Sequence, residues 1–270
     1  MLVSAHWLKK NIKNKDIKVL DASWYLPNMN RNPKKEYVKS RIPKAVFFDI
    51  DDVCDKKSNL PHMLPNKNIF EYKVSDLGIK SDDTLIVYCK EGVLSSPRVW
   101  WMFKYFGHKK VYILNGGLKA WRFVRGGTKS GPEKIIKTKY KVGRIKNKLK
   151  VTYEDLLCLK KQKKKISILD ARPKKRFLKL EPEPRKNIGR GNIEGSDNLE
   201  FSNLEINGFF KTKSAMKNIF KKVIKNNKVI CTCGSGISAC TVAFSLDLNG
   251  KFNWSVYDGS WTEWYLKTKN

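Results

Sequence analysis

A cysteine followed by two closely spaced glycines is the feature of this sequence best suited to chemistry. The stretch CTCGSGISAC, residues 231–240, holds three cysteines and two glycines in ten positions. Cys233 ends an apolar run that predicts a buried strand, and the residues after the loop predict a helix. Gly234 and Gly236 can adopt backbone angles closed to other residues, so the loop can turn its N–H groups inwards. With the positive end of the following helix behind it, the loop would hold Cys233 as a nucleophilic thiolate.

The other cysteines carry no comparable pattern. Cys231 falls in the predicted strand and Cys240 in the predicted helix, so both are interpreted as core residues, and Cys54 and Cys158 belong to no motif. Six cysteines in 270 residues are too sparse for a disulfide scaffold. Their spacing, with three scattered histidines, also fails to match a zinc site. We therefore expect free thiols and no bound metal.

Composition and charge limit the classes of function. The formal net charge of +31 raises the possibility of nucleic-acid binding, but the lysines are spread over both halves and no nucleic-acid-binding motif accompanies them. No apolar run reaches the length of a membrane span, and the first residues lack the apolar core of a signal peptide. The sequence predicts a cytoplasmic protein, with the mitochondrial matrix as the alternative, that has no membrane contact and no specific nucleic-acid partner.

The two halves of the chain repeat each other. Four segments recur in the same order at offsets of about 143 to 151 residues: KVLDASWYLP with SILDARPKKRF, RIPKAVFFD with NIEGSDNLEF, TLIVYCKEG with KVICTCGSG, and VYILNGGLKAW with WSVYDGSWTEW. This predicts similar tandem domains at 1–130 and 151–270, joined by a Gly- and Lys-rich linker at 131–150. Thr152, three residues before Asp155, is the predicted N-cap that opens the second half.

The order of elements predicts an α/β fold. Short apolar runs such as LIVYC and VICTC alternate with helical patterns such as SPRVWWMFKYFG, which indicates a mainly parallel sheet with helices on both faces in each domain. Ligand sites in such sheets lie beyond the carboxyl ends of the strands. Cys89 and Cys233 both follow a predicted strand, one in each half.

At this level of detail the chain resembles the 3-mercaptopyruvate sulfurtransferases of the rhodanese superfamily. CGSGIS is similar to that family's active-site loop, CGSGVT, and the segments FFDIDD, PHMLP, NGGLKAW, DARPKKRF, EPEPR and YDGSWTEWY match the family in order over nearly the whole chain. The resemblance implies two rhodanese-like domains, of which only the second is catalytic. It implies sulfur transfer from 3-mercaptopyruvate through a Cys233 persulfide, with release of pyruvate and without a metal or organic cofactor. The acceptor would be a thiol, such as thioredoxin or a small thiol, or cyanide.

The same resemblance assigns further site residues. Arg176 and Arg185, in RFLKLEPEPR, match the family's arginines that bind the carboxylate and keto oxygen of the substrate. Ser235, with His62 of PHMLP and Asp51 of FFDID from the first domain, matches a relay that handles a proton. The remaining loop residues would bind the substrate's sulfur: Gly234, Gly236, Ile237 and Ser238.

Two features depart from the family pattern. The loop at Cys89, CKEGVLSSPR, is longer and lacks paired glycines, so we expect its N–H groups not to converge on the sulfur and Cys89 to be non-catalytic. The family's HIPGA turn appears as RIPKA at 41–45 and as GNIEGS at 191–196, and the loss of His and Gly is expected to lower turn stability rather than activity.

Three alternatives remain. A thiosulfate sulfurtransferase usually has a charged loop such as CRKGVT, whose charges Gly234 and Ser235 replace here. A phosphatase or arsenate reductase needs an arginine that closes the cysteine loop, where this chain has Ala239. A non-enzymatic nucleic-acid-binding or sulfur-carrier protein agrees with the charge, and the intact loop and the two arginines argue against it.

Overall fold

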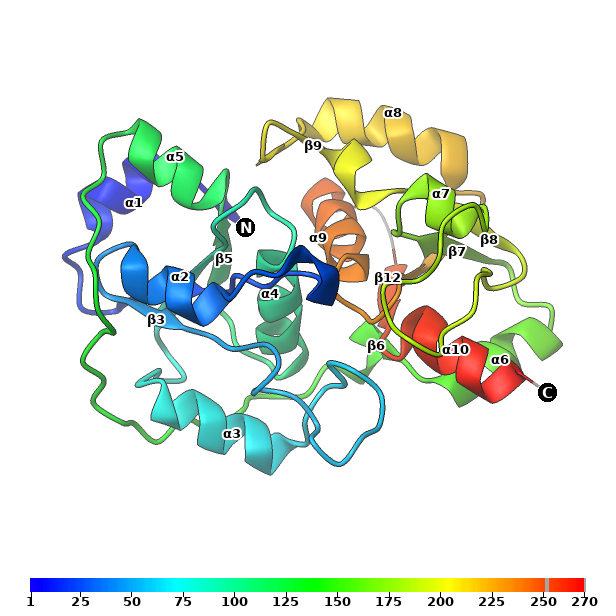
Figure 1. Cartoon of the computed structure of the whole chain (residues 1–270), viewed down its shortest axis with the longest axis horizontal. Helices are drawn as coiled ribbons and strands as arrows, with labels where there is room; N and C mark the ends of the chain where they lie inside the picture. The colour runs from blue at the N-terminus through cyan, green and yellow to red at the C-terminus, as the bar shows by residue number, and fades with distance from the viewer. Residues whose placement is uncertain (251–252, 270) are drawn as a thin grey trace. The chain divides into compact units, whose positions relative to one another are not determined.

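The computed structural model describes residues 1–250 and 253–269 and divides the chain into two compact units. Unit 1 contains Met1–Lys57, Leu64–Lys146 and Asn207–Phe209, and unit 2 contains Ser58–Met63, Asn147–Ile206 and the chain from Phe210 onwards. Each unit has its own five-stranded sheet. In Figure 1, unit 1 is drawn mainly in blue to green and unit 2 mainly in green to red.

Unit 1 is built on a parallel sheet with the strand order β1-β5-β4-β2-β3. Its strands are β1 (Leu2–Val3), β2 (Ile17–Asp21), β3 (Ala45–Phe47), β4 (Thr84–Tyr88) and β5 (Val111–Leu114). Its helices are α1 (Ala5–Asn11), α2 (Pro33–Lys39), α3 (Lys67–Asp76), α4 (Ser96–Tyr105) and α5 (Gly117–Phe123), with the 3₁₀ turn η1 (Pro27–Met29).

Unit 2 has the same arrangement, with the parallel order β6-β12-β11-β7-β8. Its strands are β6 (Lys150–Val151), β7 (Ile166–Asp170), β8 (Ser196–Asn198), β11 (Lys228–Thr232) and β12 (Asn253–Tyr257). Its helices are α6 (Tyr153–Lys161), α7 (Lys174–Phe177), α8 (Lys213–Val223), α9 (Ala239–Asn249) and α10 (Ser260–Thr268), with η2 (Asn147–Leu149) and η3 (Phe201–Leu204). The strands β9 (Glu205–Ile206) and β10 (Phe209–Phe210) pair as a short hairpin.

The repeat in the sequence is therefore a repeat of topology. Each strand of the first sheet has a counterpart at the same position in the second, and the predicted α/β fold with two parallel sheets is confirmed. The central strands β4 and β11 are apolar and buried because helices cover both faces of each sheet. Cys89 and Cys233 directly follow these two strands, at the carboxyl edge where the parallel strands end together.

The helix α6 begins at the predicted N-cap, Thr152. The Thr152 hydroxyl accepts the N–H of Asp155, and the Asp155 carboxylate accepts the N–H of Thr152, which completes a capping box at the start of α6. Residues 131–146, where the sequence suggests a linker, are grouped with unit 1. Tyr140 is buried there, and the N–H of Gly143 donates to Phe106 O at 2.9 Å.

The departures from the HIPGA turn have visible structural effects. Lys44 adopts a left-handed φ of +63°, at the position where Gly195 in unit 2 has a φ of +77°. The Arg41 side chain is buried, pairs with Glu133 at 2.7 Å and donates to Gly131 O at 2.8 Å. The strain expected from the missing glycine is therefore present at Lys44, whereas Arg41 is well packed.

The helices of the described part of the chain are too short and too polar to cross a membrane.

Candidate functional site

The loop after β11 surrounds the Cys233 sulfur with backbone groups. The Gly236 N–H donates to Cys233 Sγ at 3.1 Å, and Gly236 adopts a φ of +79° that a side chain would strain. The Cys233 side chain is only 2% exposed, and α9 begins at Ala239 directly behind the loop. An inward N–H and a helix N-terminus both favour negative charge on this sulfur.

The other predicted loop residues differ in exposure and in their hydrogen bonds. Ser235 and Ile237 are buried, and Ser238 occupies the N-cap position of α9 without a side-chain capping bond. Gly234 is partly exposed, and its carbonyl accepts both the N–H and the hydroxyl of Thr262, at 3.1 and 2.7 Å. The loop is thus fixed to the start of α10.

Ser260 also fixes the cysteine, and the sequence interpretation missed it. The Cys233 N–H donates to Ser260 Oγ at 3.2 Å, while that hydroxyl donates to Tyr257 O at 2.9 Å. Ser260 holds a left-handed φ of +53°, and its counterpart in the repeat, Gly117, has a φ of +54°. A serine at a position where the other half needs glycine was the signal in the sequence that could have identified it.

Glu183 is the second residue missed by sequence reasoning. Its carboxylate is 4% exposed and binds two arginines, Arg172 at 2.6 Å and Arg176 at 3.3 Å. A Cβ built on Gly234 would lie 3.7 Å from Glu183 Oε2, so the carboxylate lies next to the cysteine loop. Glu183 therefore connects Arg176, one of the predicted substrate-binding arginines, with the loop that carries Cys233.

Arg185, the other predicted arginine, lies beside His62. Arg185 Nη2 is 2.9 Å from His62 Nε2, and both residues belong to unit 2. A guanidinium is always a donor, so His62 Nε2 must be the acceptor and the proton of the neutral ring is on Nδ1. The structure thus brings His62 to an arginine that the sequence assigned to the substrate.

Asp51 lies in unit 1, where its carboxylate accepts a hydrogen bond from Trp24 Nε1 at 3.1 Å. Its predicted part in a relay with His62 and Ser235 stays a prediction.

Cys89 has different surroundings from Cys233. Its sulfur lies 3.4 Å from the carbonyl oxygens of both Glu91 and Gly92, which accept the thiol proton. Burial raises the pKa of the Cys89 thiol, and hydrogen bonds from Ser95 and Ser96 oppose this shift without cancelling it. The backbone N–H groups of Ser95 and Ser96 both reach this sulfur, although the longer loop was expected not to converge its N–H groups there, and burial still raises the pKa of the thiol.

The two units also differ in the partner of a buried aspartate. In unit 2, Arg172 is fully buried and pairs with Asp170, the last residue of β7, at 2.5 Å. In unit 1, the equivalent Asp21 is also buried and accepts the N–H and the hydroxyl of Ser23, at 3.0 and 2.5 Å. Burial raises the pKa of Asp21, and the hydrogen bonds from Ser23 and Tyr88 and the charge of Lys90 oppose this shift without cancelling it. Since Ser23 matches Arg172 in the sequence repeat, unit 1 has a hydroxyl where unit 2 has a guanidinium.

Among the described residues, no three His, Cys, Asp or Glu side chains are grouped as metal ligands.

Comparison with known proteins gives a consistent result. The family profile described as a Rhodanese-like domain matches residues 4–123 and again 152–267. A mouse protein named 3-mercaptopyruvate sulfurtransferase is 38% identical over 99% of this chain and 93% of its own length. A Chinese hamster (Cricetulus griseus) protein named thiosulfate sulfurtransferase is 39% identical over 98% of this chain and 91% of its own. The crystal structure of the Tum1 protein from Saccharomyces cerevisiae superposes with a TM-score of 0.92 at 34% identity, covering 99% of this chain and 95% of that one.

Proposed function

The chain belongs to the rhodanese family as a sulfurtransferase with two tandem domains, and from this premise we propose that it takes sulfur from 3-mercaptopyruvate through a persulfide on Cys233. The observation that carries the proposal is the Gly236 N–H, 3.1 Å from Cys233 Sγ, in a loop without a charged side chain. A loop of this kind stabilises a sulfur anion, and it offers no added cation for the second charge of thiosulfate.

The reaction has two half-reactions. The Cys233 thiolate attacks the sulfur of 3-mercaptopyruvate, the carbon–sulfur bond breaks, and its electron pair leaves on carbon as the enolate of pyruvate. The enolate takes one proton and departs as pyruvate, which leaves Cys233 as the persulfide. An acceptor thiolate then attacks the outer sulfur, the sulfur–sulfur bond breaks, and Cys233 returns to the thiolate.

The neighbouring side chains have roles in this scheme. Arg176 and Arg185 bind the substrate carboxylate and keto oxygen, and Glu183 holds Arg176 in position. His62, which accepts a hydrogen bond from Arg185, passes a proton to the enolate as one member of a relay with Ser235 and Asp51, and each member that gives up a proton takes another from its neighbour or from solvent.

Thiosulfate is the second candidate donor, because a relative of equal similarity carries that name. The segment from Arg176 to Arg185 favours 3-mercaptopyruvate, since two separate guanidinium groups match a substrate that carries both a carboxylate and a keto oxygen.

Intact-mass spectrometry after a single exposure to each donor, without acceptor, tests the proposal. We expect one added sulfur atom from 3-mercaptopyruvate, little from thiosulfate, and none in Cys233→Ser. The matched control, Cys89→Ser, keeps the full gain. Arg176→Gln and Arg185→Gln should slow the reaction with 3-mercaptopyruvate roughly tenfold to a hundredfold, as expected for a lost charge-assisted hydrogen bond, and should affect thiosulfate less. A preference for thiosulfate in the unaltered protein would move the donor assignment to that class.

A further inference from the structure

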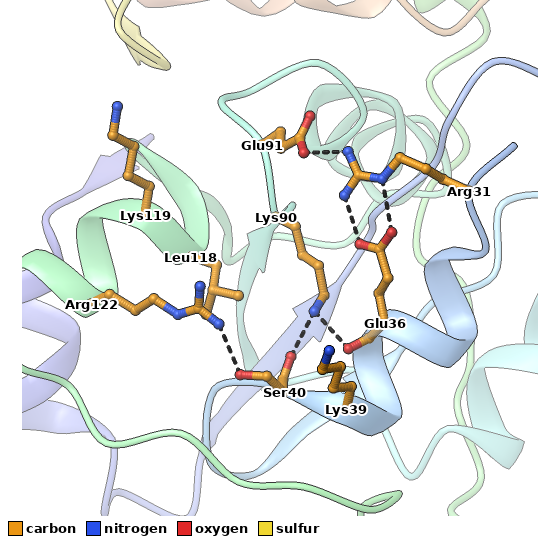
Figure 2. Close-up of a pocket in the computed structure, with 9 residues that line it drawn as sticks. All are labelled: Arg31, Glu36, Lys39, Ser40, Lys90, Glu91, Leu118, Lys119 and Arg122. Atoms are coloured by element: carbon orange, nitrogen blue, oxygen red, sulfur yellow. Dashed lines mark hydrogen bonds and ion pairs between the residues drawn. The ribbon is translucent and has the colours of Figure 1, made fainter. Parts of the chain in front are cut away.

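A cavity of about 540 Å³ lies in unit 1, the half of the chain without Cys233. Figure 2 shows its walls: the end of α2, the loop after β4, and α5. Two of these walls, the loop after β4 and α5, are the counterparts in the repeat of the cysteine loop and α10 of unit 2. Its lining residues are Arg31, Glu36, Lys39, Ser40, Lys90, Glu91, Leu118, Lys119 and Arg122.

The two acidic residues of the lining are already neutralised by an arginine of the same lining. Arg31 binds Glu36 through two nitrogens, at 2.7 and 2.8 Å, and binds Glu91 through a third. Both carboxylates therefore lie on one guanidinium, on one side of the cavity in Figure 2. With five basic and two acidic residues, the lining has a net charge of +3.

Among the described residues, the other four basic side chains of the lining form no ion pair with a carboxylate: Lys39, Lys90, Lys119 and Arg122. Lys90 Nζ donates to Glu36 O at 2.6 Å and to Ser40 O at 2.8 Å, and Arg122 Nη2 donates to Ser40 Oγ at 3.0 Å. Figure 2 shows these two side chains reaching Ser40 from the loop and from α5.

These bonds leave donors in place for a ligand. An ammonium has three donors and a guanidinium five, so one N–H of Lys90 and four of Arg122 remain after these bonds. Burial lowers the pKa of Lys90, which shows that its charge is poorly solvated. A bound anion would supply the solvation that this ammonium lacks.

We propose that this cavity is a binding site for a small dianionic oxyanion, a phosphate or sulfate group. Lys90 and Arg122 bind its oxygens beside Ser40, and the exposed Lys39 and Lys119 add charge at the rim. The volume exceeds that of the oxyanion alone, so the group can belong to a small organic molecule. No reaction is expected there, because Cys89 is buried and protonated. The site is independent of the sulfur donor at Cys233.

The test is a titration of the isotope-labelled full chain with inorganic phosphate at constant ionic strength, followed by amide NMR. We expect saturable shifts at Ser40, Lys90 and Leu118. The triple variant Lys39→Gln, Lys119→Gln, Arg122→Gln should weaken binding at least roughly tenfold, because three of the unpaired cations are lost. A matched control, Lys57→Gln, Lys67→Gln, Lys139→Gln, removes the same charge from exposed residues of unit 1 outside the cavity and should bind as the unaltered protein does.

A second titration with glycerol 3-phosphate identifies the source of the oxyanion. Tighter binding than inorganic phosphate indicates a phosphorylated metabolite, and weaker binding indicates the free anion; both outcomes support the site. Shifts that do not saturate, that avoid Ser40 and Lys90, or that weaken equally in both triple variants would overturn the proposal. Sulfur transfer is not measured in this experiment, so its outcome does not depend on the donor assigned to Cys233.

Discussion

At the scale of single residues, the difference between the two cysteines comes from the atoms that face each sulfur. Cys233 receives an N–H from Gly236, whereas Cys89 donates to two carbonyls and has its pKa raised by burial. Both thiols are buried and both follow a central strand, so neither exposure nor position distinguishes them. The carbonyls of Glu91 and Gly92 and the effect of burial favour a protonated Cys89, and this difference supports the proposal that the sulfur chemistry belongs to Cys233.

Ser260 allows a sharp test of how the cysteine is positioned. Ser260→Ala removes the acceptor of the Cys233 N–H and keeps the left-handed strain, so we expect persulfide formation to slow several-fold and the free energy of unfolding to fall by about 1–3 kcal/mol. Ser260→Gly should slow the reaction equally and cost less stability, because glycine relieves the strain. Stopped-flow kinetics and urea unfolding measure the two effects. An unchanged rate in both variants would make Ser260 purely structural.

At the scale of elements, the turn before β3 stores strain in one half only. Lys44 holds a φ of +63°, which costs a non-glycine residue roughly 1–2 kcal/mol, while Gly195 occupies the equivalent place in unit 2. Lys44→Gly should stabilise unit 1 by about 0.5–1 kcal/mol after the entropy lost by glycine is subtracted. That corresponds to a rise in Tm of about 1–4 °C in thermal unfolding. Lys44→Ala is the control and should bring no such gain in Tm, since alanine keeps the strain. An equal gain in both variants would mean that loss of the lysine side chain, and not relief of the backbone strain, raises the stability.

Elements were easier to predict than their contacts. The strands before Cys89 and Cys233 are short apolar runs bounded by polar residues, and the capping pair Thr152 and Asp155 is local, so both could be read from neighbouring positions. Glu183 could not be predicted as part of the site, because its partners Arg172 and Arg176 identify it only after folding brings it beside Gly234. The cavity in unit 1 depends in the same way on three segments far apart in the sequence.

At the scale of the whole molecule, the net charge of +31 acts against compactness. Fifty-six basic residues face only 25 acidic ones, so most surface charges repel their neighbours. Raising NaCl from about 10 to about 200 mM shortens the Debye length from roughly 30 Å to below 10 Å and should raise the Tm by several degrees. At low salt, the Tm of the variant Lys57→Gln, Lys67→Gln, Lys139→Gln should be higher than that of the unaltered protein, and added NaCl should raise it less. A fall in Tm with salt would mean that ion pairs, and not repulsion, dominate.

The buried ion pair of Arg172 and Asp170 has a consequence for how the second half can change over generations. Both side chains are fully buried, and Arg172 also pairs with Glu183. A single substitution at Arg172 or Asp170 leaves a buried charge without its partner, which is strongly destabilising. In an evolving lineage these two positions can therefore change only together, whereas the equivalent Asp21 and Ser23 of unit 1 are joined by hydrogen bonds and are not tied to each other by charge.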